Sequence, residues 1–176
     1  MTEHRPEPWL RGPLPGIPAL LQPVGHAFVM ATEDVAAAVE DLGPDELWIQ
    51  PGGIASIGFH LAHLSGSTDR LLTYARGGLL SEPQRAALAR EGAISTIRPS
   101  LTELLTNWRT TVRTALEQLS STSESALSEP REVGRARLPS TVLGLLFHAA
   151  EHASRHTGQV VTTARMVRAA RAAGSP

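Results

Sequence analysis

The stretch from Ser140 to about Ala172 constrains the fold most, because apolar residues and histidines recur along it at three- and four-residue steps. Such steps keep side chains on one face of an α-helix. They predict one long helix whose inner face must pack against other helices. The residues on that face are Leu145, Ala149, His152, His156, Gln159 or Val160, Thr163, and Met166 or Val167.

Three other long stretches show the same helical periodicity, at about 24–42, at about 54–74, and after the sequence Ser100-Leu-Thr-Glu103. That sequence has the pattern of a capping box, as does Ser81-Glu-Pro-Gln84, which opens a short helix ending at about Glu91. No segment alternates polar and apolar residues over a convincing strand length. The chain is therefore predicted to be all-α, a four-helix bundle with a short extra helix.

The first 23 residues are expected to form an extended N-terminal arm, followed by a single bundle domain over residues 24–176. Proline fixes φ and lacks an amide donor, so a proline-rich segment does not form a helix. Trp9 and Leu10 are candidate anchors for the arm. The prolines of the arm are Pro6, Pro8, Pro13, Pro15, Pro18 and Pro23.

Composition excludes several classes of function. The chain has no cysteine, so disulfides, thiolate metal sites and a cysteine nucleophile are ruled out. Its formal net charge is −1, which gives no overall attraction to nucleic acid or to an anionic membrane. No apolar run approaches the ~18 residues of a transmembrane helix, and the N-terminus has no apolar signal core. We expect a cytoplasmic protein.

Five of the seven histidines lie in two predicted helices. His148, His152 and His156 follow one another at four-residue steps, which places adjacent imidazoles one helical turn apart on one face. This spacing allows one helix to offer two imidazoles to one metal ion. His60 and His63 belong to the second predicted helix, and periodicity alone places His60 nearer its apolar stripe.

Clustered histidines on inner faces favour a metal site. Buried imidazoles without a metal would each need an acceptor and would repel one another on protonation. The pair His152 and His156 is therefore predicted to bind a divalent ion. Three imidazoles and one open position are typical of catalytic sites, where a water held by the ion is the expected nucleophile or base. Imidazole suits zinc, nickel, copper or iron.

One motif suggests a different enzyme. His148-Ala-Ala-Glu-His152 has the His-x-x-Glu-His pattern of inverted zinc peptidases. Those enzymes also need a carboxylate ligand further along the chain, and no Asp or Glu follows Glu151. We therefore reject the peptidase interpretation. Arg165, Arg168 and Arg171 are interpreted as cations that favour a helix C-terminus and not as an anion site.

Two blocks of the sequence resemble the DinB/YfiT-like superfamily, many of whose members are metalloenzymes with no assigned reaction. The first block is Ser56 to Leu72, SIGFHLAHLSGSTDRLL, and the second, more specific block is Ala150 to Gln159, AEHASRHTGQ. The resemblance spans nearly the whole chain in helix order. It implies an up-down-down-up four-helix bundle in which one histidine of the second helix and two of the last bind a metal.

Carried onto this sequence, the resemblance implies His63, His152 and His156 as the ligands and nickel or zinc as the usual ion. It favours His63 over His60. His60 and His148 then become neighbours of the site, and Glu151 or Gln159 would orient the ligands. Related branches use low-molecular-weight thiols in transfer or isomerisation reactions. Homodimers are common in the family, so the resemblance also implies a homodimer.

Two functions are therefore carried forward. The first is a metal-dependent enzyme, a thiol-dependent S-transferase or a hydrolase, with an open coordination position and a small-molecule substrate. The second is a non-catalytic bundle that binds a metal or small molecule and acts as a stress-response or interaction module. A fourth protein ligand, supplied by His60 or His148, would distinguish the second function from the first.

Overall fold

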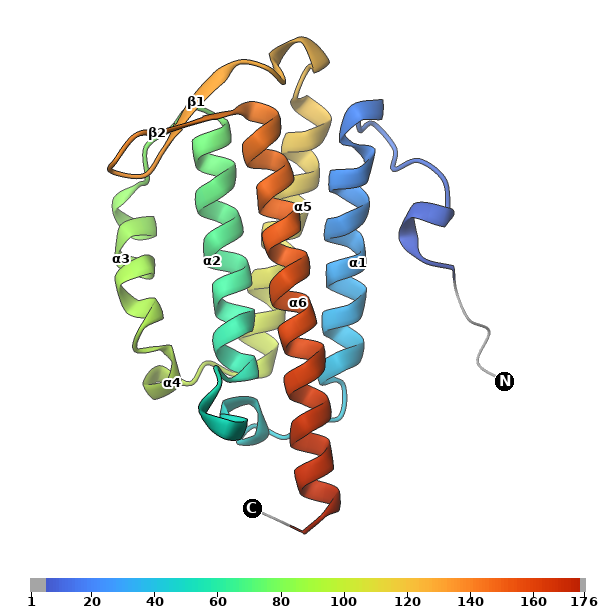
Figure 1. Ribbon diagram of the computed structural model, residues 1–176, viewed down its shortest axis with the longest axis vertical. Coiled ribbons are helices and arrows are strands. Elements are labelled where there is room, and N and C mark those ends of the chain that lie inside the picture. The colour runs from blue at the N-terminus through green and yellow to red at the C-terminus, as the bar shows by residue number, and fades with distance from the viewer. Residues whose placement is uncertain (1–5, 175–176) are drawn as a thin grey trace.

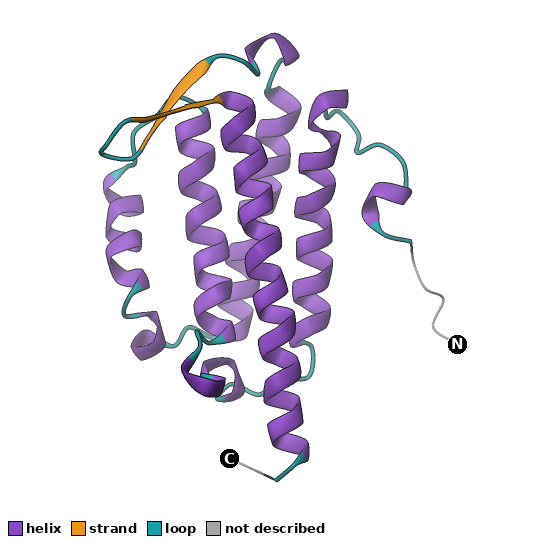
Figure 2. Ribbon diagram, in the orientation of Figure 1, coloured by secondary structure: helices purple, strands orange, loops and turns teal. Residues whose placement is uncertain are grey.

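The computed structural model describes residues 6–174 and consists mainly of four long helices (Figures 1 and 2). Shorter helices and a hairpin connect them. The long helices are α1 (Gln22–Val39), α2 (Ile57–Ala75), α5 (Leu101–Ser121) and α6 (Val142–Ala172). The connecting elements are α3 (Glu82–Glu91), α4 (Ile94–Ile97), β1 (Pro130–Val133), β2 (Leu138–Thr141) and five 3₁₀ turns, Pro8–Leu10, Ala19–Leu21, Glu46–Trp48, Pro51–Gly53 and Glu124–Ala126.

The all-α bundle prediction is confirmed, with the up-down-down-up order. In Figure 1, α1 and α6 run in one direction and α2 and α5 in the other. Helices α2 and α5 run parallel because the chain returns along the outside of α2, through α3 and α4, before it enters α5. The most extensive helix packing in the described chain joins α2 to α6.

The helix starts follow from their capping residues. Ser81 and Ser100 form complete capping boxes with Gln84 and Glu103, as the sequence predicts. Ser56 Oγ accepts a hydrogen bond from the amide of Phe59 (3.2 Å), so α2 begins three residues later than its apolar pattern indicates.

The hairpin before α6 is not predicted by the sequence. β1 and β2 pair antiparallel, with Pro130 opposite Thr141 and Val133 opposite Leu138. Each strand has four residues, and neither strand has a buried one. The amino-acid sequence of the hairpin therefore lacks the alternation of polar and apolar residues that would identify a strand. The second strand leads directly into α6, whose first turn is capped by Thr141.

The core is built mainly from leucine, valine and alanine, with the aromatic rings of Phe28, Trp48 and Trp108. The rings of Phe28 and Trp108 lie 6.5 Å apart between centroids. The described part of the arm lies along α1. Trp9 and Leu10 do not anchor it, since they are 57% and 58% exposed. Arg11 does so instead, through two hydrogen bonds to the Glu33 carboxylate.

Within residues 6–174, no helix is both long and apolar enough to cross a membrane.

Candidate metal centre

Three histidines from α2 and α6 meet at the contact between these helices. His63, His152 and His156 each offer a ring nitrogen, and the three nitrogens lie within 4.8 Å of one another. The Nε2 atoms of His63 and His152 are 3.0 Å apart. The ring of His156 lies 4.5 Å, between centroids, from each of the other two. These are the three residues that the resemblance implied.

Helix packing explains why the three rings converge. His152 and His156 are one turn apart on α6 and therefore share a face. His63 reaches them from α2, with its ring stacked on that of Phe59 at 5.7 Å and an interplanar angle of 7°. All three histidines are half-buried. The cluster is thus held by the core on one side and open to solvent on the other.

The donor set fits a divalent ion. Zinc binds histidine nitrogen at about 2.0–2.1 Å, which puts two nitrogens of a tetrahedral site about 3.3 Å apart. The 3.0 Å separation between His63 and His152 is close to that value. Without an ion, two ring nitrogens at this distance can share only one proton between them. A common ion satisfies both lone pairs at once.

His60 lies deeper than the cluster, as its periodicity predicted, and is only 6% exposed. Its Nδ1 is 3.0 Å from Nδ1 of His156. The three-residue group does not include it. His60 therefore occupies the Nδ1 side of the His156 ring.

The other predicted pocket residues lie at the outer edge of α6. His148 is exposed, with its ring centroid 5.6 Å from that of His152 and its Nδ1 3.3 Å from Glu151. Glu151 accepts a hydrogen bond from Arg155 at 2.8 Å. Gln159 is also exposed, and no hydrogen bond joins it to the three histidines in the described chain. The roles expected for Glu151 and Gln159 remain predictions.

Burial favours the neutral form of His60, His152 and His156. It lowers the pKa of His156 to about 4, and the neighbouring His63, His152 and His60 add to the effect. Burial also lowers the pKa values of His60 and His152, with a further contribution from His63 in each case. Since only neutral imidazole binds a metal, these shifts prepare the cluster for an ion at neutral pH.

The structure adds one polar residue that the sequence did not suggest. Glu91, the last residue of α3, accepts a hydrogen bond from His63 Nδ1–H at 3.1 Å and another from Arg70 at 2.5 Å. Burial raises the pKa of the Glu91 carboxyl, but these two hydrogen bonds outweigh it and hold that pKa below its usual value. The sequence places Glu91 only at the end of a short predicted helix. It does not indicate the contact with His63, because the packing of α3 on α2 leaves no periodic pattern.

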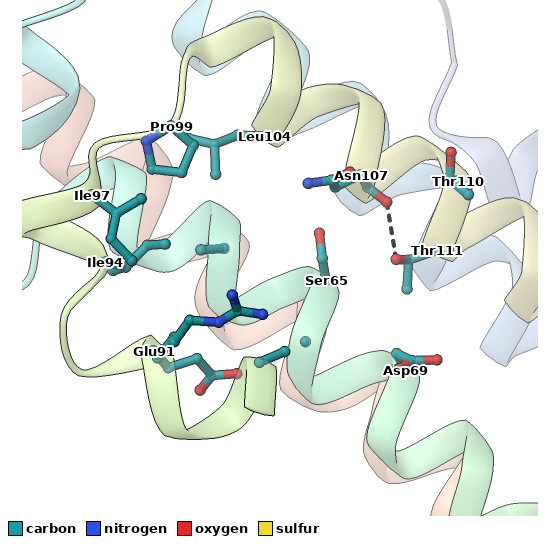
Figure 3. A pocket seen from close by; sticks show the side chains of 14 residues that line it. Ser65, Asp69, Glu91, Ile94, Ile97, Pro99, Leu104, Asn107, Thr110 and Thr111 are labelled. Carbon is teal, nitrogen blue, oxygen red and sulfur yellow. Dashed lines mark hydrogen bonds between the residues drawn. The ribbon is translucent and has the colours of Figure 1, made fainter. Parts of the chain in front are cut away.

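A cavity of about 480 Å³ lies between α2, α3, α4 and α5 (Figure 3). Its walls include Ser65, Asp69, Asn107 and Thr111, and Figure 3 shows Glu91 at its edge. None of the clustered histidines lines it. The three clustered histidines are therefore separate from the cavity, although Glu91 and Gly66 both line it.

Comparison of the sequence with known protein families gives one match. Residues 27–160 match the family model described as the DinB superfamily, which covers α1 through most of α6 and includes all three clustered histidines. No curated protein matches the chain.

Proposed function

The chain belongs to the DinB superfamily, and from this premise we propose that it is a divalent-metal-dependent enzyme. His63, His152 and His156 hold the ion, with nickel or zinc as the expected metal. The reaction is transfer of a thiol to a small-molecule substrate, or hydrolysis. The convergence of these three imidazoles at one point, with no fourth ligand among residues 6–174, is the observation that carries the proposal.

The residues of the chain perform two tasks in this function. The three imidazoles would hold the ion at the solvent-facing edge of the α2–α6 contact. Phe59 stacks on His63 and restricts rotation of its ring. When bound, the ion supplies Lewis-acid chemistry and lowers the pKa of a thiol or water in its open position.

Charge favours a thiol as the partner of this site. Three neutral imidazoles leave the full charge of a divalent ion uncompensated, so an anionic ligand binds there more readily than a neutral one. The chain has no cysteine to supply a thiolate of its own. A low-molecular-weight thiol would complete the coordination from outside, which favours the transferase over the hydrolase.

A second copy of the chain is the proposed protein partner. Leu143 and Phe147 lie one turn apart on α6 and are 39% and 59% exposed. Apolar residues spaced in this way present a common face on the helix. Their burial in a homodimer is checked by light scattering on the wild type and on Phe147→Ser, which should shift toward the monomer.

One observation favours the alternative of a non-catalytic metal-binding bundle. His60 lies 3.0 Å from His156, so a rotation of its ring would bring a fourth imidazole to the ion. Such a closed shell would exclude a substrate. The two functions differ in whether an added thiol reaches the metal.

The experiment measures both metal content and access. Untagged protein is purified and its metals are determined by elemental analysis, with His63→Ala, His152→Ala and His156→Ala beside it. His148→Ala is the matched control, since it lies one turn before His152 but outside the three-residue group. We expect about one ion per chain in the wild type and the control, and a loss in the other three.

Cobalt(II) then replaces the native ion, and a small thiol is titrated into the sample. A new absorption from thiolate bound to cobalt supports the open site and is followed by assays of thiol transfer. A cobalt spectrum that does not respond to thiol, and that changes in His60→Ala, would show a closed site and reject the enzyme. Metal retained in all three alanine variants would reject the ligand assignment.

A further inference from the structure

We propose that Glu91 is the positioning residue of the metal centre, which fixes the tautomer and the orientation of His63 and thereby sets the affinity for the ion. This inference rests on the proposed function for its metal-binding part. It gives a role to a residue of α3, an element that contributes none of the three ligands.

Both oxygens of the Glu91 carboxylate are engaged. Oε2 accepts from Nδ1–H of His63 and Oε1 accepts from Arg70, at 3.1 and 2.5 Å. The side chains of Glu91, His63 and Arg70 are 17%, 20% and 12% exposed. A carboxylate held from two sides and largely out of water is an acceptor with one fixed position.

The hydrogen bond determines which nitrogen of His63 is free. A neutral imidazole carries one proton, and a carboxylate that accepts at Nδ1 requires the proton to be there. Nε2 then keeps its lone pair, and Nε2 is the atom that lies 3.0 Å from His152. Glu91 thus selects the tautomer in which His63 faces its fellow ligands.

Gly66 makes this arrangement possible. A Cβ atom at Gly66 would lie 2.5 Å from Oε1 of Glu91 and 2.9 Å from the Arg70 guanidinium. Any larger residue at this position of α2 would push the carboxylate away from its place above the helix. The position of the Glu91 carboxylate therefore depends on three residues of α2: the ligand His63, the cation Arg70 and the glycine Gly66.

Glu91 is distinctive among the acidic residues near the cluster. In the part of the chain that the structure describes, no other carboxylate is hydrogen-bonded to any of the three clustered histidines. Glu151 is paired instead with His148 and Arg155. A purely structural role, in which Glu91 merely attaches α3 to α2, would affect stability but neither the tautomer nor the metal.

The first test needs no metal. The tautomer of His63 is read from the ring nitrogen resonances of metal-free protein near pH ~8, where imidazole is neutral. We expect the Nδ1–H form in the wild type and in Glu82→Gln, an exposed glutamate on the same helix. Glu91→Ala should shift His63 toward the Nε2–H form. Nε2–H in the wild type, or no change in Glu91→Ala, would overturn the inference.

The second test measures affinity for zinc by competition with a coloured chelator. Glu91→Ala should bind zinc roughly 10–100-fold more weakly, and Glu91→Gln less severely because an acceptor oxygen remains. Gly66→Ala should weaken binding although every ligand and Glu91 itself are intact. Gly158→Ala is its control, since a Cβ there meets no atom within 4 Å.

The outcomes separate this inference from the proposed function. A wild type that binds no zinc rejects the proposed function, and the tautomer measurement still decides whether Glu91 sets His63. Wild-type affinity in Glu91→Ala and Gly66→Ala, with reduced urea stability, would show that Glu91 is only a structural link and would reject the inference while leaving the metal site standing.

Discussion

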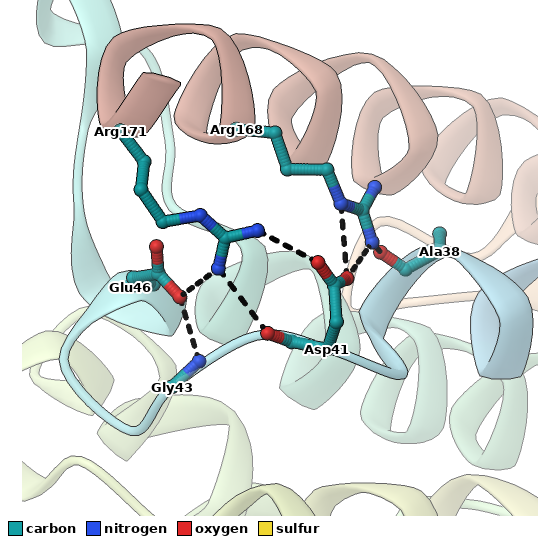
Figure 4. Close-up of polar contacts among 6 residues, drawn as sticks. All are labelled: Ala38, Asp41, Gly43, Glu46, Arg168 and Arg171. Atoms are coloured by element: carbon teal, nitrogen blue, oxygen red, sulfur yellow. Dashed lines mark hydrogen bonds and ion pairs between the residues drawn. The ribbon is translucent and has the colours of Figure 1, made fainter. Parts of the chain in front are cut away.

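Asp41, just beyond the end of α1, accepts a hydrogen bond from Arg168 Nε of α6 at 2.9 Å (Figure 4). A second nitrogen of Arg168 bonds both this carboxylate and the backbone carbonyl of Ala38, and Arg171 donates to the other Asp41 oxygen at 2.7 Å. The two arginines, interpreted from the sequence as cations near a helix end, therefore join α6 to α1 beyond the histidine cluster.

This link predicts a stability that depends on salt and pH. Hydrogen bonds from Arg168 and Arg171 hold the pKa of Asp41 well below its usual value. The contribution of the Asp41 carboxylate to the free energy of unfolding is therefore complete above the unfolded pKa of about 3.9, and it is lost as the pH falls below that value. Asp41→Asn should lower the urea midpoint at pH 7, less so in high salt. Glu117→Gln, which breaks an exposed pair with Arg113, is the control and should change little.

Trp48 lies directly against Gly58 near the start of α2. A Cβ at Gly58 would be 2.5–2.7 Å from three atoms of the indole ring, which is 7% exposed. Gly58→Ala should therefore destabilise the protein by roughly 1–3 kcal/mol, because the buried ring cannot move aside. Gly158→Ala should instead be neutral or stabilising by up to about 1 kcal/mol. Equal urea stability in the two variants would contradict this packing.

The metal-free protein should lose stability in mild acid. The pKa of His156 is lowered by burial to about 4, so the unfolded chain binds more protons than the folded one below about pH 6.5. Stability is thus complete above about pH 6.5 and falls toward pH 4. Urea midpoints across this range test it, and His156→Gln should give a shallower slope. His26→Gln, far from the cluster, should keep the wild-type slope, and a common slope for all three would refute the assignment.

Trp108 should be the most sensitive residue of the core. It is fully buried, and Trp108→Ala is expected to cost about 3–5 kcal/mol through lost contacts and a cavity. Its indole nitrogen has no hydrogen-bond partner in the described chain. Trp108→Phe removes this unsatisfied donor and should cost only roughly 1–2 kcal/mol. Thermal or urea unfolding of both variants measures the difference, and a similar loss in both would show that the ring is not the main contribution.

The sequence predicted what depends on local spacing. The four helices, both capping boxes and the shared face of His152 and His156 follow from three- and four-residue steps. The choice between His60 and His63 did not, because periodicity leaves the rotation of a helix uncertain by tens of degrees. The structure places His60 beneath the cluster and His63 within it.

Features that join distant segments were beyond the sequence argument. Glu91 meets His63 only because α3 folds back along α2, and Asp41 meets Arg168 only because α1 and α6 are neighbours. The hairpin was missed for a different reason, since its eight residues bury no apolar face. Local patterns record which side of an element is buried but not which element covers it.

Helix α3 contains no buried residue. Its hydrogen bonds to α2 join Gln84 to Asp69 and Thr73, and Glu91 to His63 and Arg70. A helix held by so few contacts opens more readily than the core, so its amide protons should exchange early. Binding energies are reciprocal: if docked α3 strengthens the hold on an ion, the ion must strengthen the docking of α3 by the same free energy. Amide exchange in residues 82–91 would then slow when zinc is added. The exchange rate of α3 would therefore indicate whether the three clustered histidines hold an ion.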